Sequence, residues 1–137
     1  MTTDFKSARR YRRKPGGFVI AIRLDLETEG FRYKKWGGWQ LCKPGDWLVY
    51  NQGDTYTVDA EVFARTYRRI GPGRYVKTTP VWAVKAQHPG EVTTREGVSR
   101  YQAGDYLVSN DPAGEDRYCV SAEMFESLYE PDPFMDE

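Results

Sequence analysis

Apolar and polar positions alternate along this chain in two stretches of about 55 residues that follow the same order of elements. The first stretch opens at 18–24, an apolar and β-branched run that predicts a strand buried on both faces. Short alternating runs separated by Gly-rich turns follow it. The segment 60–69 then has an apolar stripe of helical spacing behind Asp59, which is a good N-cap, and it predicts a short helix.

The second stretch repeats this order. Its apolar strand, 80–86, matches 18–24 at an offset of 62 residues, and a helical pattern capped by Ser121 closes it. We therefore predict an α+β protein built from two tandem β-rich pseudo-repeats. Each repeat is expected to be an antiparallel meander of four or five strands followed by one short helix. A unit this short buries little apolar surface alone, so we expect the pair to pack as one compact unit with approximate twofold symmetry.

The most exact repetition is the sequence Gly-Asp-Trp-Leu-Val at 45–49 and Gly-Asp-Tyr-Leu-Val at 104–108. Two aspartates suggest paired carboxylates, but a structural role explains them better. Glycine permits the left-handed backbone of a tight turn, and aspartate accepts hydrogen bonds from nearby backbone amides. The predicted structural residues are Gly45, Asp46, Trp47, Gly104, Asp105 and Tyr106.

Charge is distributed unevenly, although the formal net charge of the 137 residues is zero. Residues 1–14 hold six basic residues and one acidic residue, a net charge of +5, whereas 123–137 hold six acidic residues and no base. Such ends can bind outside partners, bind each other or stay solvated. The predicted boundaries are a basic N-terminal arm at 1–16, the first repeat at 17–70, a linker at 71–75, the second repeat at 76–131 and an acidic tail at 132–137.

Basic side chains interleave with aromatic ones in the predicted hairpin 31–39, whereas the corresponding stretch 91–98 contains no tryptophan. Three interpretations remain open. The pattern is ordinary strand alternation, a protein contact, or a nucleic-acid surface on which rings stack on bases and basic groups contact phosphates. With the arm included, the candidate ligand-binding residues are Arg10, Arg13, Arg32, Lys34, Lys35, Trp36 and Trp39.

The sequence lacks the motifs of several common enzyme and metal-binding classes. It has no Gly-rich phosphate loop, no nucleophile elbow and one histidine, His88, and its two cysteines lack metal-ligand spacing. We therefore predict no enzyme, no catalytic residue, no metal and no cofactor. No apolar run reaches the roughly 18 residues of a membrane helix, and no signal peptide is recognised, so we expect a cytoplasmic protein without a membrane partner.

One family resemblance rests on short motifs. The run from Gly104 to Val108, the alternating 117–120 and the helix that ends before Pro131 together resemble the small PGDYG-motif proteins of phages and bacteria. The basic segment 10–15 resembles their N-terminal opening, and 43–47 is the first repeat's version, with Trp in place of Tyr. The match covers one repeat at a time, and the duplication departs from the family's single copy. The resemblance implies a small, compact, phage-linked protein and no mechanism.

These observations favour a non-enzymatic binding or interaction module, phage- or defence-associated, that takes a protein or a small ligand in the groove between the repeats. The alternative is nucleic-acid or nucleotide binding through the basic arm and the hairpin 31–39. The zero net charge counts against this alternative, because sequence-independent nucleic-acid binding depends on a basic surface. Monomer and homodimer both remain open.

Overall fold

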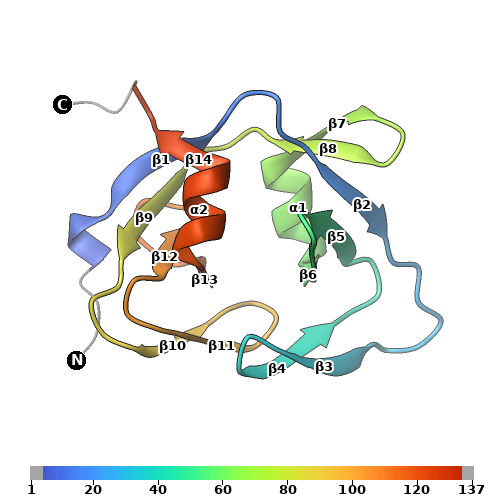
Figure 1. Ribbon diagram of the computed structural model, residues 1–137. Helices are drawn as coiled ribbons and strands as arrows, with labels where there is room; N and C mark the ends of the chain where they lie inside the picture. Colours follow the sequence, from blue (N-terminus) through green and yellow to red (C-terminus); the bar gives the residue numbers. More distant parts are fainter. Residues whose placement is uncertain (1–4, 134–137) are drawn as a thin grey trace.

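The computed structural model describes residues 5–133, and its framework is a pair of five-stranded antiparallel sheets (Figure 1). The first sheet has the order β6 (Asp54–Val58), β5 (Trp47–Asn51), β2 (Val19–Arg23), β8 (Arg74–Lys77) and β7 (Tyr67–Gly71). The second has the order β13 (Arg117–Val120), β12 (Tyr106–Ser109), β9 (Val81–Lys85), β1 (Arg9–Arg13) and β14 (Tyr129–Pro131).

Two hairpins and two short helices complete the fold. The hairpins are β3 (Phe31–Lys35) with β4 (Gly38–Cys42), and β10 (Gly90–Thr93) with β11 (Val98–Tyr101). The helices are α1 (Ala60–Thr66) and α2 (Ala122–Leu128), and a 3-10 turn, η1, covers Phe5–Ser7. Antiparallel sheets with few helices agree with the predicted α+β class. The predicted meander is wrong in detail, because each hairpin leaves its sheet and a strand from elsewhere in the chain takes the place beside β2 or β9. The approximate twofold symmetry stays a prediction.

The two sheets exchange strands with each other. Strand β1 pairs with β9 and β14 of the second sheet, although the next strand along the chain, β2, belongs to the first. Strand β8 pairs with β2 and β7 of the first sheet and leads into β9 of the second. Residues 9–13, predicted as part of a basic arm, are therefore an internal strand. The segment 71–75, predicted as a linker, contains the β7–β8 turn and the start of β8.

Both helices end sooner than their sequence pattern predicts. Helix α1 ends at Thr66, and Tyr67 is extended at φ −123° and ψ 151° because it begins strand β7. Thr66, Tyr67 and Ile70 are β-branched or aromatic residues, which have low helix propensity and suit strands. Pairing with β8 therefore overrides the helical pattern that continues through Arg69.

Each helix presses one phenylalanine onto its own sheet. Phe63 of α1 stacks on Trp47, with ring centroids 4.2 Å apart, and on Tyr67 at 4.5 Å. Phe125 of α2 stacks in the same manner on Tyr106 at 4.2 Å and on Tyr129 at 4.8 Å. Aromatic stacking of this kind adds about 0.5–1.5 kcal/mol beyond area burial. These stacks fix each helix above its sheet, on the side that faces the other half of the molecule (Figure 1).

The two hairpins join the halves at the other end of the molecule from β1 and β8 (Figure 1). The buried side chain of Gln40 donates through Nε2 to the Val98 carbonyl oxygen at 2.7 Å, and the Arg100 amide donates to the Trp36 carbonyl at 2.8 Å. Gly97 lies at φ 156°, and a Cβ there would meet the Trp39 carbonyl oxygen, so only glycine allows this close approach. The exchanged strands β1 and β8 at one end, and the hydrogen bonds between the two hairpins at the other, therefore hold the halves at a fixed spacing.

The role of β1 as an internal strand can be tested through Tyr11. Its ring is half-buried and lies edge-on to Phe125, with centroids 5.0 Å apart. We expect Tyr11→Ala to lower the free energy of unfolding by about 2–3 kcal/mol, because it removes a large packed ring from the core of the second sheet. Urea unfolding measures the change. The exposed neighbour Arg9 supplies the control, since Arg9→Ala should change stability by less than about 0.5 kcal/mol. Equal effects of the two substitutions would contradict the strand role.

Candidate ligand-binding cavity

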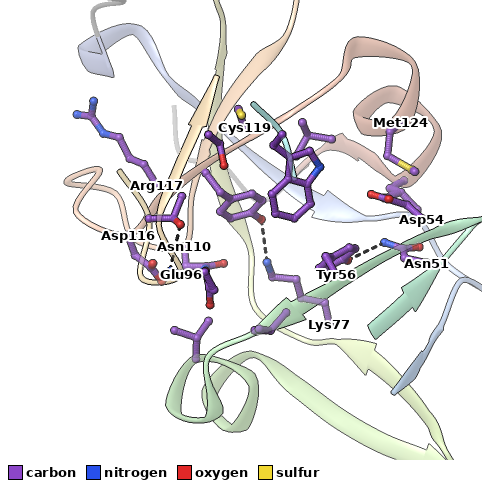
Figure 2. Close-up of a pocket in the computed structure, with 18 of the residues that line it drawn as sticks. Asn51, Asp54, Tyr56, Lys77, Glu96, Asn110, Asp116, Arg117, Cys119 and Met124 are labelled. Atoms are coloured by element: carbon purple, nitrogen blue, oxygen red, sulfur yellow. Dashed lines mark hydrogen bonds between the residues drawn. The ribbon is translucent and has the colours of Figure 1, made fainter. Parts of the chain in front are cut away.

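A cavity of about 310 Å³ lies between the two halves of the molecule. Helices α1 and α2, strands β6, β7, β8, β13 and β14 and parts of both hairpins supply its lining. The cavity lies where the sequence predicts a groove, and its role in binding stays a prediction. Figure 2 shows its wall, with polar groups such as Asn51, Lys77 and Asn110 among rings and apolar side chains.

Four tyrosines line the cavity, two from each half. Tyr56 and Tyr118 occupy the corresponding strands β6 and β13, where they lie opposite Val49 and Val108. Tyr67 and Tyr129 begin the corresponding strands β7 and β14, directly after the helices. All four rings reach the cavity because the two helices hold the sheets apart over this region. The result is a set of phenol groups gathered from four separate strands.

A cation from each exchanged strand reaches the same cavity. Arg13 of β1 lies across from Tyr129, with its guanidinium carbon 5.6 Å from the ring centroid. Lys77 of β8 lies across from Tyr67, with Nζ 5.9 Å from the ring centroid. Lys77 also donates a hydrogen bond of 3.0 Å to the Tyr118 hydroxyl of the other half, as Figure 2 shows. Strand exchange therefore delivers one positive side chain from each half to the space between them.

Burial changes the proton affinity of these groups. Desolvation lowers the pKa of Lys77, and the nearby Arg13 charge lowers it further, while Tyr129 opposes the change. Lys77 is only half-buried by accessible surface, because its side chain faces the cavity, but protein atoms surround it closely enough to displace bulk water. Desolvation raises the pKa of Tyr56 to about 12 and raises the pKa values of Tyr67 and Tyr118 well above 10. The phenols therefore keep their protons at neutral pH and can donate hydrogen bonds.

The other charged side chains of the lining have partners. The acids are Asp54, which pairs with Lys35 at 2.9 Å, Glu96 and Asp105, which accept backbone amides at 2.8 and 2.9 Å, and Asp116, which accepts from Asn110 at 3.0 Å. The bases are Arg95, paired with Glu61 at 3.1 Å, Arg100, paired with Glu91 at 3.3 Å, and Arg117, which donates to the Gly114 carbonyl at 2.6 Å. Burial raises the pKa of Glu96, which favours its neutral form. Figure 2 shows Arg117 directed away from the cavity.

Two asparagines at corresponding places add hydrogen-bonding groups. Asn51 ends β5 and is 5% exposed, and Asn110 directly follows β12. Their amide nitrogens donate to Tyr56 Oη at 3.2 Å and to Asp116 Oδ2 at 3.0 Å. Their Oδ1 atoms are buried and have no hydrogen-bond partner among residues 5–133. A buried acceptor without a donor is uncommon in native proteins, and here protein atoms enclose both oxygens.

The structure separates the candidate residues that the sequence grouped together. Arg10 forms an ion pair of 2.8 Å with Asp132, which joins the predicted arm to the start of the predicted tail. Arg13 lines the cavity. The rest lie on or beside the β3–β4 hairpin: Arg32, Lys34 and Trp39 are exposed, Lys35 pairs with Asp54, and Trp36 at φ 55° lines the cavity. Strand β1 and this hairpin lie at opposite ends of the molecule (Figure 1), so the seven residues do not form one surface.

The repeated Gly-Asp turns hold backbone in place. Asp46 is 1% exposed and accepts hydrogen bonds from the Lys43 amide at 2.8 Å and the Ala60 amide at 3.2 Å. Asp105 accepts from the Gln102 amide at 2.9 Å. Gly45 and Gly104 have φ values of 90° and 97°, which favour glycine. Trp47 and Tyr106 pack under the helices, as described above. These contacts support the structural role predicted for both motifs.

The cavity residues Asn51, Tyr56, Tyr67, Lys77, Asn110, Tyr118 and Tyr129 are absent from the sequence-based candidates. A signal for most of them is present in the sequence, because Asn51 and Asn110, and Tyr56 and Tyr118, recur at corresponding places in the two stretches. A recurring polar or aromatic residue also fits ordinary strand alternation, so repetition alone does not indicate a cavity. Lys77 had no such signal, because 71–75 was predicted as a linker that separates it from the first half.

Residues 5–133 contain no group of three or more His, Cys, Asp or Glu side chains able to hold a metal ion. No helix in the described part of the chain has the length and apolarity that a membrane crossing requires. Comparisons with protein-family models, curated proteins and solved structures find no match to this chain. The resemblance to PGDYG-motif proteins therefore stays a resemblance of short motifs.

The two Gly-Asp turns should differ in energetic weight. Asp46 holds two backbone amides and Lys43 Nζ from a buried position, whereas one backbone amide donates to half-buried Asp105. We expect Asp46→Ala to cost about 3 kcal/mol of unfolding free energy and Asp105→Ala about 1 kcal/mol, because buried amides lose their acceptor in the first case. Guanidinium unfolding of both variants measures the difference. Equal losses would show that the buried contacts of Asp46 add nothing.

The buried charge of Lys77 should cost stability at neutral pH. Because the pKa of Lys77 is lowered in the folded state, the unfolded state binds more protons between the two pKa values, and stability rises with pH there. We expect Lys77→Met to raise the melting temperature at about pH 7, and the gain to shrink as pH approaches the ordinary lysine pKa of about 10.5. Thermal unfolding at both pH values checks this. Lys85→Met, at an exposed site on β9, should show no gain, and a loss of stability in Lys77→Met would contradict the expectation.

Proposed function

We propose that this protein is a non-enzymatic module that binds a small ligand in the cavity between its two halves. The observation that carries the proposal is a cavity lined by both halves, in which Lys77 and the phenols of Tyr56, Tyr67, Tyr118 and Tyr129 lie among apolar side chains. A volume of about 310 Å³ falls at the lower end of the range for small-molecule sites, about 300–1,000 Å³. A mixed lining of apolar side chains and a few convergent polar groups is also typical of such sites.

The arrangement of the lining supports a binding role over a purely structural one. A cavity costs packing energy, and buried polar atoms without partners cost more, so a fold without a ligand gains from filling the space. Here the strand exchange and the contacts between the two hairpins keep the halves apart, and residues of both helices line the cavity. We further propose that the two halves are tandem repeats with approximate twofold symmetry, which explains why tyrosines and asparagines occupy corresponding places.

Nucleic-acid binding through the β3–β4 hairpin is the second candidate. Trp39 is 55% exposed, and Lys34 Nζ lies 5.4 Å from its ring centroid, so a ring and a cation are available to a base and a phosphate. The basic arm no longer supports this function, because Arg10 and Arg12 pair with Asp132 and Glu130 at 2.8 Å. The hairpin alone supplies a small surface, and the cavity therefore remains the favoured site.

A cavity-filling substitution tests the proposal. Met124 on α2 lines the cavity (Figure 2). Its neighbour Glu123 is exposed and is not part of the lining. We expect ligand-detected NMR with a library of small acids, amines and neutral aromatic compounds to identify ligands of the wild-type protein. Met124→Trp should weaken their binding by at least about tenfold, because the larger side chain occupies the ligand's volume, and Glu123→Trp should leave it unchanged.

Circular dichroism and cooperative thermal unfolding of both variants establish that the fold is kept. The proposal fails if no compound binds the wild-type protein. It also fails if the ligands found bind the Met124→Trp variant as tightly as the wild type, because they would then occupy another surface.

A further inference from the structure

The charges that line the cavity do not balance locally. Each of its four acids accepts a hydrogen bond or pairs with a base, and Arg95, Arg100 and Arg117 hold partners of their own. Arg13 and Lys77 differ from them. Among residues 5–133, no carboxylate lies within 4.0 Å of either cation, and both lie beside tyrosine rings instead. Arg13 and Lys77 therefore share one partly desolvated space. The carboxylate of Asp116 acts on Lys77 from beyond ion-pair distance, and it accepts a hydrogen bond from Asn110.

Two like charges in such a space oppose each other. Arg13 lowers the pKa of Lys77, so each cation makes the other less favourable. Burial of a charge without a partner is costly, and a buried like-charge pair persists only where something offsets it. The hydroxyl of Tyr118 accepts one hydrogen bond from Lys77, but a neutral acceptor supplies no compensating charge. A bound anion would supply that charge.

The phenols complete a set of donors suited to an anion. Tyr118 accepts from Lys77 and interacts with the Tyr129 hydroxyl, and Tyr67 interacts with the Tyr56 hydroxyl. If one phenol of each pair donates to the other, one hydroxyl proton of each pair remains for a ligand. Tyr56, Tyr67 and Tyr118 stay protonated at neutral pH because burial raises their pKa values. Hydrogen bonds from charged donors to an oxyanion are about twice as strong as neutral ones, and guanidinium groups bind carboxylate and phosphate through two parallel bonds. Donors from the five strands β1, β6, β7, β8 and β13 thus line the same cavity.

Part of the remaining lining is apolar and indicates what the anion is attached to. Val58, Val62, Val120, Met124 and Leu128 line the cavity alongside Trp36. An inorganic ion would leave this surface and most of the volume without contacts. An organic group beside the anion would bury it, at about 25 cal/mol for each Å² of apolar surface.

We infer that the cavity binds a small organic anion, a carboxylate or a phosphate monoester, whose oxygens accept from Lys77, Arg13 and the tyrosine hydroxyls while its apolar part contacts the valines and Met124. This inference rests on the proposed function, because it names the ligand class of the same cavity. The two cations favour a negatively charged ligand, and the apolar part of the lining favours a ligand with an apolar organic group.

The test uses two probes that differ in charge and share one shape, 2-naphthoate and 2-naphthamide. Isothermal titration calorimetry at about pH 7, where the carboxylate is ionised, measures both against the full chain. We expect the wild-type protein to bind 2-naphthoate at least about tenfold more tightly than 2-naphthamide. Lys77→Met and Arg13→Gln should each weaken 2-naphthoate by about 10- to 100-fold, the range for lost charged hydrogen bonds, and change 2-naphthamide by less than about threefold.

Three matched variants separate charge from structure. Arg9→Gln changes an exposed arginine on the same strand as Arg13 and should leave both affinities unchanged. Lys77→Arg keeps the charge and should restore 2-naphthoate binding to within about tenfold of the wild type. If Lys77→Met does not fold, Arg13→Gln and Tyr118→Phe carry the test, because Tyr118→Phe removes one hydroxyl donor and keeps the ring.

The outcomes distinguish this inference from the proposed function. One outcome would refute the anion class and still support a ligand-binding cavity. In that outcome both probes bind with equal affinity, Lys77→Met and Arg13→Gln have no effect, and Met124→Trp abolishes binding. Inorganic phosphate bound as tightly as 2-naphthoate would refute the organic class. The inference is refuted if the wild-type protein binds neither naphthalene probe and does not bind phosphate. The compound library, tested on the wild type and on Met124→Trp, then decides separately whether the cavity binds any ligand.

Discussion

The pairing of β1 with β9 and β14 is the constraint on which both halves of this molecule depend. In the first sheet, β8 lies between β7 and β2, and the next strand in the chain, β9, belongs to the second sheet. In the second sheet, β1 lies between β14 and β9, and the next strand in the chain, β2, belongs to the first sheet. Without β1, strands β9 and β14 would lose the partner that joins them, and Tyr11 would leave the aromatic cluster around Phe125. Neither half is therefore a complete unit, and their spacing is set by covalent connections as well as by packing.

The cavity follows from this constraint. Exchanged strands carry Arg13 and Lys77 from one half to the boundary with the other, where the tyrosines that begin β7 and β14 lie across from them. The helices that precede those tyrosines keep the sheets apart, because each is fixed to its own sheet by a stacked phenylalanine. Elements that stabilise the fold thus also place the groups that distinguish the cavity from an ordinary interface.

Local patterns in the sequence predicted most strands that alternate between Gly-rich turns, and they predicted both helix starts. The apolar run at 18–24 and the hairpin at 31–39 belong to this group. The expected burial of 18–24 on both faces is wrong, because Ile20 and Ile22 of β2 are 47% and 54% exposed. Strand β1 was missed because Arg-Arg-Tyr-Arg-Arg holds one apolar residue and has the composition of a solvated arm. Strands β7 and β14 were missed because no turn separates them from the helices. In each case the deciding interaction is pairing with a distant segment, which periodicity does not contain.

The candidate site was harder to predict for the same reason. Repetition marked Tyr56 and Tyr118 as corresponding residues, but only the strand exchange brings Lys77 within hydrogen-bonding distance of Tyr118, 41 positions away. Arg13 was selected as part of a nucleic-acid arm, and the structure places it in the cavity instead. Sequence reasoning found the residue and missed its surroundings, because the environment of a charged group depends on what the fold places around it.

The distance along the chain between β1 and its partners has a consequence for synthesis on the ribosome. Arg10 and Asp132, which form an ion pair, are 122 positions apart. The first sheet can close once β8 has left the ribosome, but β1 must wait for β9 and then for β14 at the other end of the described chain. During that interval a strand rich in arginine remains unpaired, and its charge keeps it in water rather than on the open edge of another sheet. The basic composition of β1, which made it hard to recognise as a strand in the sequence, thus suits the long period during which it is not yet paired in a sheet.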